Sequence, residues 1–160
     1  NYLCSAACAT DVALATETVG RVSDHPNVAG MKDSSGNMER FTLTRRATAA
    51  ADLDLLVGSG SILAHAMDAG ADGGVLALSN VAPAAASEVY ERHRSGDTEG
   101  AHALNADLVE LNRAITAEYS VHGLKYAMGE RGAPAGHERR PHSPPDGDAR
   151  ERLDELVAGL

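Results

Sequence analysis

Lys32 is the side chain in this sequence best placed to carry covalent chemistry. It ends the apolar run 27–32 and stands directly before the polar, glycine-containing segment 33–37. Parallel α/β folds display their reactive groups where a strand ends and such a loop begins. A lysine whose stem is packed among apolar groups has its charged form disfavoured, and the neutral amine can attack a ketone to give a Schiff base. The alternative is a lysine whose stem covers apolar surface while its ammonium reaches solvent.

The remaining polar groups point to chemistry less directly. His65 and Asp68 are three residues apart in a helical pattern, but no third metal ligand is evident, and the other histidines share no metal-ligand spacing. The Gly-x-Gly turn at 58–60 lacks the rest of a nucleotide fingerprint, and no Ser or Cys stands in a nucleophile elbow. Asp33 and Ser34 either take part in catalysis or cap the next helix by accepting its free N–H groups.

Three segments repeat the same order of apolar run, glycine-containing loop and helical pattern. The apolar runs are 27–32, 53–57 and 73–78, and the helical patterns after them are 38–51, 62–69 and 83–94. Strand, loop and helix alternating in this way predict parallel βα units. Residues 14–23 resemble the helix of a preceding unit whose strand is missing or reduced to a stub at residues 1–3.

The pattern changes towards the C-terminus. The spacing of apolar residues predicts one long amphipathic helix over 97–119 and a shorter helix over 122–131. An extended loop is expected over 132–148, which holds four of the six prolines, and a terminal helix over 149–160.

Composition and charge exclude several classes of function. The chain has 160 residues, 43% of them apolar, and a formal net charge of −9, which argues against nucleic acid as a partner. No uncharged apolar run reaches the ~18 residues of a membrane helix, and no basic segment precedes an apolar stretch at the N-terminus. Cys4 and Cys8 are not spaced as CxxC and cannot form a disulfide framework. We therefore expect a cytoplasmic protein that binds neither nucleic acid nor membrane.

The segment Gly30-Met-Lys32-Asp-Ser-Ser-Gly36 resembles the Schiff-base motif of the dihydrodipicolinate synthase and N-acetylneuraminate lyase superfamily, pyruvate-dependent class I aldolases. Residues 55–60 resemble the family's seventh strand, and residues 71–83 resemble its eighth strand with the turn after it. Its C-terminal helical region is resembled by residues 123–128, followed by the pairs 140–141 and 144–145. The resemblance thus covers most of the sequence.

The resemblance implies an α/β fold, the C-terminal part (strands six to eight) of a (βα)8 TIM barrel with an appended C-terminal helical region. Residues 1–95 would hold βα units six to eight, and residues 96–160 the helical region of the same domain. Strands one to five lie outside this sequence, together with the Thr/Ser-rich loop that holds the pyruvate carboxylate in relatives. Because three strands cannot close a barrel, we expect a homo-oligomer or a missing N-terminal half as partner.

The same resemblance implies roles for individual residues. Lys32 would be the nucleophile, and its iminium the electron sink for the bond to C3 of bound pyruvate, so no metal or organic cofactor is required. Gly58 and Ser59 would line the path of the substrate, and the backbone carbonyl of Val75 would lie near the Schiff base. The family's catalytic tyrosine stands in a Tyr-Asn-x-Pro context. Either it lies upstream of this sequence, or Tyr2 takes its place through a shifted register.

The leading hypothesis for function is therefore a lyase of the class I aldolase type, with a 2-keto acid as small-molecule substrate and pyruvate plus an aldehyde as products. Residues 6–9 lack the arginine that synthases carry after the tyrosine motif, which favours a 2-keto-3-deoxy sugar acid as substrate. The alternative is a dihydrodipicolinate synthase-type condensation. A hypothesis of another class is a truncated, catalytically inactive fragment or the partner-dependent half of a split barrel.

Overall fold

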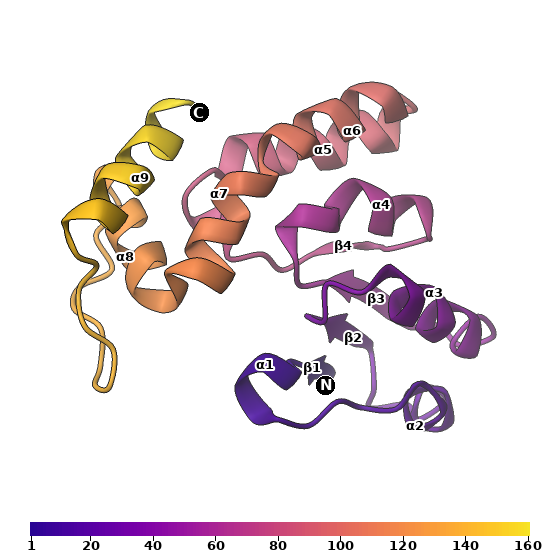
Figure 1. Cartoon of the computed structure of the whole chain (residues 1–160). Coiled ribbons are helices and arrows are strands. Elements are labelled where there is room, and N and C mark those ends of the chain that lie inside the picture. The colour runs from indigo at the N-terminus through magenta and orange to yellow at the C-terminus, as the bar shows by residue number, and fades with distance from the viewer.

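Four parallel strands form the sheet on which the candidate site is built. The strands are β1 (Tyr2–Ser5), β2 (Gly30–Asp33), β3 (Asp54–Val57) and β4 (Gly73–Gly74), and they pair in chain order. The computed structural model in Figure 1 describes the backbone of residues 1–160 and every side chain except those of residues 8 and 9. The stub expected at residues 1–3 is a complete strand, whereas the run 73–78 forms a strand of only 2 residues.

Each strand is followed by one or two helical segments, which confirms the predicted parallel βα units. After β1 come α1 (Ala7–Thr10) and α2 (Thr16–Val22), and after β2 comes α3 (Met38–Ala47). After β3 come the 3-10 turn η1 (Gly60–Ile62) and α4 (Leu63–Asp68), and after β4 come the 3-10 turn η2 (Leu78–Asn80) and α5 (Pro83–Ser95).

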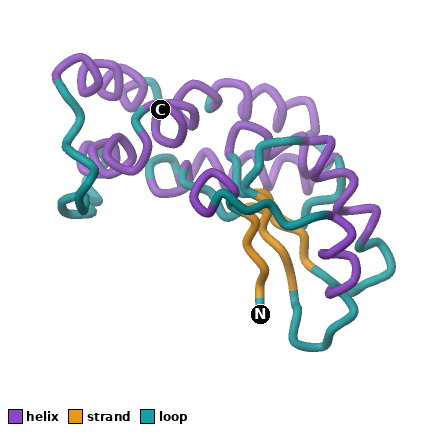
Figure 2. The backbone as a smooth tube through the Cα atoms, turned by 60° about the horizontal axis from the view of Figure 1, so that its bottom comes forward, coloured by secondary structure: helices purple, strands orange, loops and turns teal.

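In the part of the chain that the structure describes, helices cover one face of the sheet and leave the other face open (Figure 1 and Figure 2). Met31, Leu55 and Val57 point to the covered face and are fully buried, together with Val19 of α2 and Phe41 of α3. Burying an apolar side chain of this size is worth about 1.5–3 kcal/mol, so this face holds the helices in place. Because side chains alternate along a strand, the intervening residues point the other way and are exposed or half-buried there: Tyr2, Cys4, Lys32 and Leu56.

The C-terminal region is helical, as predicted. It comprises α6 (Thr98–Asp107), α7 (Val109–Arg113), the π-helical turn η3 (Ala114–Glu118), α8 (Ser120–Glu130) and α9 (Gly147–Ala158). Figure 2 shows the α8–α9 pair set apart from the strands. Within the described part of the chain, no helix has the length and apolar character needed to cross a membrane.

The single helix predicted over 97–119 is divided into three segments. The first, α6, ends at Asp107, and the N–H of the next residue, Leu108, bonds to the carbonyl of Asn105, three residues back. Further on, the N–H of Tyr119 bonds to the carbonyl of Ala114, five residues back, which is the π-helical spacing. The Thr116 hydroxyl also bonds to a carbonyl four residues back, a contact that often bends a helix. The apolar periodicity therefore predicted a helical region correctly, but it does not indicate where the helix changes its hydrogen-bonding pattern.

Two asparagines fasten this helical region to the loop between β3 and α4. Asn105 is buried, and its Oδ1 accepts a hydrogen bond from the Ala64 N–H at 2.8 Å while its Nδ2 donates to the Gly60 carbonyl at 2.8 Å. Asn112 Nδ2 donates to Ser61 Oγ at 2.8 Å. The C-terminal helices thus support a loop in which two of the predicted site residues stand.

Candidate active site

Lys32 is the third residue of β2, and its side chain lies on the open face of the sheet. The strand register places it beside Cys4 of β1 on one side and Leu56 of β3 on the other. Its Cε closely approaches Gly58, since a Cβ on that glycine would lie 2.9 Å from it. The half-buried stem of Lys32 is therefore enclosed by neighbouring strands near their carboxyl ends, as the sequence predicted for a reactive lysine.

Gly58 allows the ends of β2 and β3 to lie close together beside Lys32. A Cβ at Gly58 would overlap Ser34 Oγ and would lie 2.8 Å from the backbone Cα of Ser34. The Gly58 N–H donates to the Asp33 carbonyl at 2.7 Å, which draws the two strand ends together. Among the described residues, the buried Ser34 hydroxyl has no hydrogen-bond partner. The carboxyl ends of β2 and β3 therefore approach each other more closely than a side chain at Gly58 would allow.

Ser59 and Val75 stand at the same edge of the sheet. A Cβ on Gly36 would lie 3.8 Å from Ser59 Oγ, so the loops after β2 and β3 face each other. Val75 is 54% exposed, and its N–H donates to the Val57 carbonyl at 2.9 Å directly after β4. The structure thus brings these predicted residues to the carboxyl ends of β3 and β4, at the edge of the sheet towards which Lys32 also lies. Their contact with substrate stays a prediction.

Tyr2 lies towards the opposite end of the strands. It begins β1 in register with Gly30, and its hydroxyl donates a hydrogen bond to Asp54 Oδ2. That hydrogen bond, with partial burial and the nearby carboxylate charge, raises the pKa of the Tyr2 phenol. The shifted register that would carry Tyr2 to the position beside Lys32 is not formed. That position belongs to the exposed free thiol of Cys4, which sequence reasoning missed because no local signal sets the register.

Asp33 and Ser34 do not cap the following helix. The N-cap of α3 is Asn37, whose Oδ1 accepts a hydrogen bond from the Arg40 N–H at 3.0 Å. Asp33 instead accepts from the Ser35 N–H at 2.8 Å and pairs with the Arg40 guanidinium. The expected capping interaction is therefore made by Asn37, the residue immediately before the first helical position.

His65 and Asp68 belong to a cluster on the outer helices, away from Lys32. Asp68 Oδ1 lies 2.8 Å from His93 Nε2, and Oδ2 lies 2.7 Å from His102 Nε2. The His65 and His102 rings meet edge to face with centroids 4.6 Å apart. Burial alone would raise the pKa of the Asp68 carboxyl, but the hydrogen bonds and charges of both imidazoles lower it. Among the residues whose side chains are described, no group of three such ligands could hold a metal ion.

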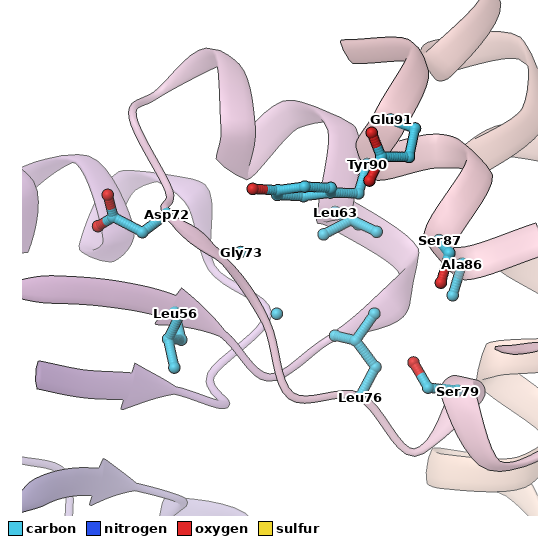
Figure 3. A pocket seen from close by; sticks show the side chains of 11 residues that line it. Leu56, Leu63, Asp72, Gly73, Leu76, Ser79, Ala86, Ser87, Tyr90 and Glu91 are labelled. Carbon is cyan, nitrogen blue, oxygen red and sulfur yellow. The ribbon is translucent and has the colours of Figure 1, made fainter. Parts of the chain in front are cut away.

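A pocket opens at the outer edge of β4, as Figure 3 shows. Its lining includes Leu56 and Gly73 from the sheet, Leu76 from the loop after it and Tyr90 from α5. Since Leu56 also neighbours Lys32 in the register, the pocket reaches the open face of the sheet. β4 is the last strand described on this side, so its outer edge is open to another strand.

Parallel βα units that carry a lysine on the open face of the sheet, near the carboxyl ends of the strands, are the arrangement of part of a TIM barrel. The sequence profile of the Dihydrodipicolinate synthetase family matches residues 4–159. The chain therefore belongs to the dihydrodipicolinate synthase and N-acetylneuraminate lyase superfamily, as the motif around Lys32 predicted.

Individual relatives show the same relationship. The chain is 35% identical over 147 residues to an uncharacterized DapA-like lyase of Halobacterium salinarum, covering 92% of this chain and 48% of that protein. It is 36% identical over 151 residues to the 4-hydroxy-tetrahydrodipicolinate synthase of Alcanivorax borkumensis, covering 92% and 50%. It matches the crystal structure of the chloride-inhibited dihydrodipicolinate synthase from Acinetobacter baumannii, complexed with pyruvate, with a TM-score of 0.90 and 28% identity, covering 99% and 55%.

The chain thus spans about half the length of the relatives it matches and corresponds to their C-terminal half. The match to this structure confirms an α/β fold that corresponds to about 55% of a TIM-barrel chain. The numbering of the strands within a complete barrel stays a prediction.

Proposed function

We propose that Lys32 forms a Schiff base with the keto group of pyruvate or a larger 2-keto acid, and that the chain is part of a class I aldolase. The observation that carries this proposal is the position of Lys32 near the carboxyl end of β2, on the uncovered face, with its stem against Gly58. The pyruvate in the related Acinetobacter baumannii complex supports a 2-keto acid as the class of substrate.

The proposed reaction needs only the amine and proton transfers. The neutral Lys32 amine adds to the keto carbon, and the resulting carbinolamine takes up a proton on its hydroxyl and loses water to give a cationic iminium. When the bond between C3 and C4 breaks, the C4 hydroxyl gives up its proton and C4 leaves as an aldehyde, while the electron pair of the broken bond forms the C2=C3 double bond of an enamine. Protonation of C3 and hydrolysis release pyruvate and restore the amine. We assign Gly58, Ser59 and the carbonyl of Val75 to the wall along which the substrate lies.

We propose a 2-keto-3-deoxy sugar acid as the substrate, because residues 6–9, directly after β1, contain no arginine to bind a second carboxylate. A condensation of the dihydrodipicolinate synthase type is the alternative, supported by the name of the Alcanivorax borkumensis relative. Pyruvate release from 2-keto-3-deoxy acids, measured beside formation of the dihydrodipicolinate-type product from pyruvate, separates the two.

We further propose that the active unit contains strands beyond the four described here. Four strands do not close a barrel, and Tyr2 and Val75 are each 54% exposed on the open side of the sheet. The other strands would come from a longer chain or a second polypeptide, within a homo-oligomer that works in the cytoplasm. If this half exists without a partner, the open sheet favours the alternative of an inactive fragment.

Borohydride trapping tests the proposal directly. The chain is incubated with pyruvate and sodium borohydride, and the adduct is located by peptide mass spectrometry. Lys32→Ala should remove the adduct, while Lys125→Ala should leave it unchanged. Lys125 is the matched control because it is the only other lysine, and its Nζ donates to the carbonyls of Ala135 and His137, at 3.2 and 2.8 Å.

Each outcome of the trapping experiment has a distinct meaning. An adduct confined to Lys32 supports the Schiff-base role. No adduct in a folded chain, followed by an adduct once a polypeptide with the N-terminal half of a relative is added, indicates a split barrel. No adduct under either condition refutes the proposal, and equal labelling of Lys125 reveals surface reactivity alone.

A further inference from the structure

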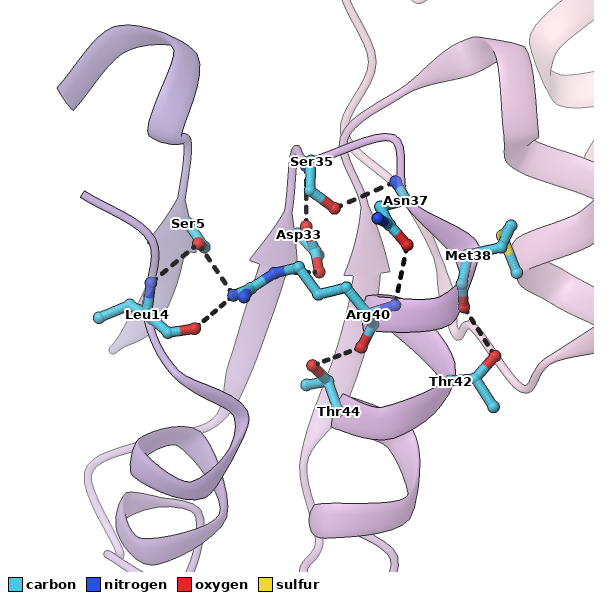
Figure 4. A network of polar contacts seen from close by, with 9 residues as sticks. All are labelled: Ser5, Leu14, Asp33, Ser35, Asn37, Met38, Arg40, Thr42 and Thr44. Carbon is cyan, nitrogen blue, oxygen red and sulfur yellow. Dashed lines mark hydrogen bonds and ion pairs between the residues drawn. The ribbon is translucent and has the colours of Figure 1, made fainter. Parts of the chain in front are cut away.

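We propose that Arg40 is a positioning residue for Lys32, acting from the helix-covered face of the sheet. This inference rests on the proposed function of Lys32 as the reactive amine. Arg40 belongs to the first turn of α3, and its guanidinium lies between the carboxyl ends of β1 and β2, as Figure 4 shows. It therefore lies behind the strands that carry the site.

The guanidinium joins three parts of the chain. Arg40 Nε donates to Asp33 Oδ2 at 3.2 Å, and Nη2 donates to Ser5 Oγ at 3.2 Å. Nη2 also donates to the Leu14 carbonyl in the segment before α2. The side chain of Asp33 is only 1% exposed and that of Arg40 is 19% exposed. One cation thus links the last residues of two neighbouring strands to the segment that follows the first.

These contacts bear on Lys32 because of the strand register. Ser5 pairs with Asp33, and the preceding residues, Cys4 and Lys32, pair on the opposite face. Successive side chains of a strand point to opposite faces, so the direction of residue 32 is coupled to that of residue 33. Holding the carboxylate of Asp33 behind the sheet therefore fixes the orientation of Lys32 in front of it.

The same network fixes the loop beside Lys32. Asp33 Oδ1 accepts from the Ser35 N–H at 2.8 Å, and the Ser35 hydroxyl accepts from the Asn37 N–H at 3.1 Å. Asn37 in turn caps α3 by accepting from the Arg40 N–H. Arg40 and its hydrogen-bond partners therefore hold both ends of the loop between β2 and α3.

The chemistry of this cluster requires arginine in particular. A buried carboxylate needs a charged partner, and the planar guanidinium serves two acceptors at once with fixed geometry. A lysine keeps the charge but is a flexible point donor, so it cannot hold Asp33 and Ser5 together in the same way. Arg40→Lys therefore separates geometric positioning from charge compensation. Arg45→Lys is the matched control, since Arg45 lies on the same helix and pairs with Asp72 at 3.6 Å near the surface.

The test uses the two lysines of the chain as an internal pair. Trace acetic anhydride labels amines, and mass spectrometry gives the labelling ratio of Lys32 to Lys125 over a range of pH. Arg40→Lys should change this ratio at least ~3-fold, while Arg45→Lys should leave it unchanged. With pyruvate and borohydride, Arg40→Lys should lower the maximal adduct rate roughly 10-fold and change the half-saturating pyruvate concentration less than ~2-fold.

An Arg40→Lys chain that unfolds like the wild type and keeps both the labelling ratio and its pH dependence would overturn the inference. If the Arg40→Lys chain does not fold, the Ser5→Ala variant provides the test. This variant removes the Ser5 hydroxyl as an acceptor for Arg40 and keeps the ion pair between Arg40 and Asp33. It should change the labelling ratio of Lys32 to Lys125 in the same direction at every pH by at least ~2-fold, and an unchanged ratio overturns the inference. The acetic anhydride labelling needs no pyruvate and is therefore independent of the borohydride trapping. Absence of a pyruvate adduct in the wild type would refute the proposed function, while the labelling ratio would still test whether Arg40 positions Lys32.

Discussion

Substituting Gly58 by alanine is the most direct test of the packing around Lys32. The added methyl group would overlap the Ser34 hydroxyl and lie 2.8 Å from the Ser34 Cα and 2.9 Å from the Lys32 Cε. The hydroxyl can rotate away, but the Cα belongs to the backbone, which must retreat by roughly half an ångström to reach ordinary contact. Overpacking of this kind costs about 1–3 kcal/mol of unfolding free energy. A displaced lysine should also react more slowly, by roughly 10-fold to 100-fold.

Urea denaturation and borohydride trapping measure these two effects separately. Gly129→Ala is the control, because Gly129 is an exposed residue of α8 with no atom within 4 Å of an added methyl. In a helix this change should stabilise the chain by up to about 1 kcal/mol, and it should leave the trapping of Lys32 unchanged. If Gly58→Ala matched the wild type in both measurements, the close approach of the two strand ends would be refuted.

Three further predictions concern other contacts. Alkylation of Cys4 with N-ethylmaleimide should block borohydride trapping of Lys32, because the two residues lie side by side in the strand register. The Cys4→Ala variant should be trapped equally well with and without N-ethylmaleimide. Trapping of Lys32 that survives alkylation of Cys4 would contradict this register. Asn105→Ala should lower the unfolding free energy, measured with urea, by about 2–4 kcal/mol, since the Ala64 N–H and the Gly60 carbonyl lose their hydrogen-bond partner. The control Asn80→Ala loses one exposed hydrogen bond and should cost less than about 1 kcal/mol. Equal losses would argue against the role of Asn105. Folding lowers the pKa of the Asp68 carboxyl. The ionised carboxylate therefore stabilises the folded chain at pH values above its ordinary pKa, and this stabilisation is lost as the pH falls through the lowered pKa. The stability difference between the wild type and Asp68→Asn should therefore shrink at acidic pH, and a constant difference in urea titrations would refute this.

The sequence predicted the features that depend on local pattern. Alternating apolar runs and helical spacing identified the parallel βα units, and the position of Lys32 at the end of such a run placed it at the carboxyl ends of the strands. These features could be predicted because each rests on neighbours within a few residues in the chain. Gly58 and Ser59 were named from the resemblance to the family instead, and their contact with substrate stays a prediction.

The neighbour of Lys32 could not be predicted in the same way. Whether Tyr2 or Cys4 lies beside it depends on the register between β1 and β2, which pairs residues 28 positions apart in the chain. A slip of two residues would bring Tyr2 to the position of Cys4 while each side chain of β1 kept its face of the sheet. The cap of α3 shows the same limit at shorter range, since Asp33 and Ser34 were the expected caps, whereas Asn37, directly before the helix, makes the contact. The partners of Asp68 come from two other helices and left no local signal.

The strand register and the surroundings of Lys32 are linked through the two faces of β2. On one face Asp33 is buried with Arg40, and on the other Lys32 stands between Cys4 and Leu56 near the open side of the sheet. A slip of β1 would remove Ser5 from the guanidinium, so the same ion cluster that holds the strands also opposes the register in which Tyr2 would be a neighbour of the lysine. The polar contacts behind the sheet therefore determine which side chains can share the space around the amine of Lys32.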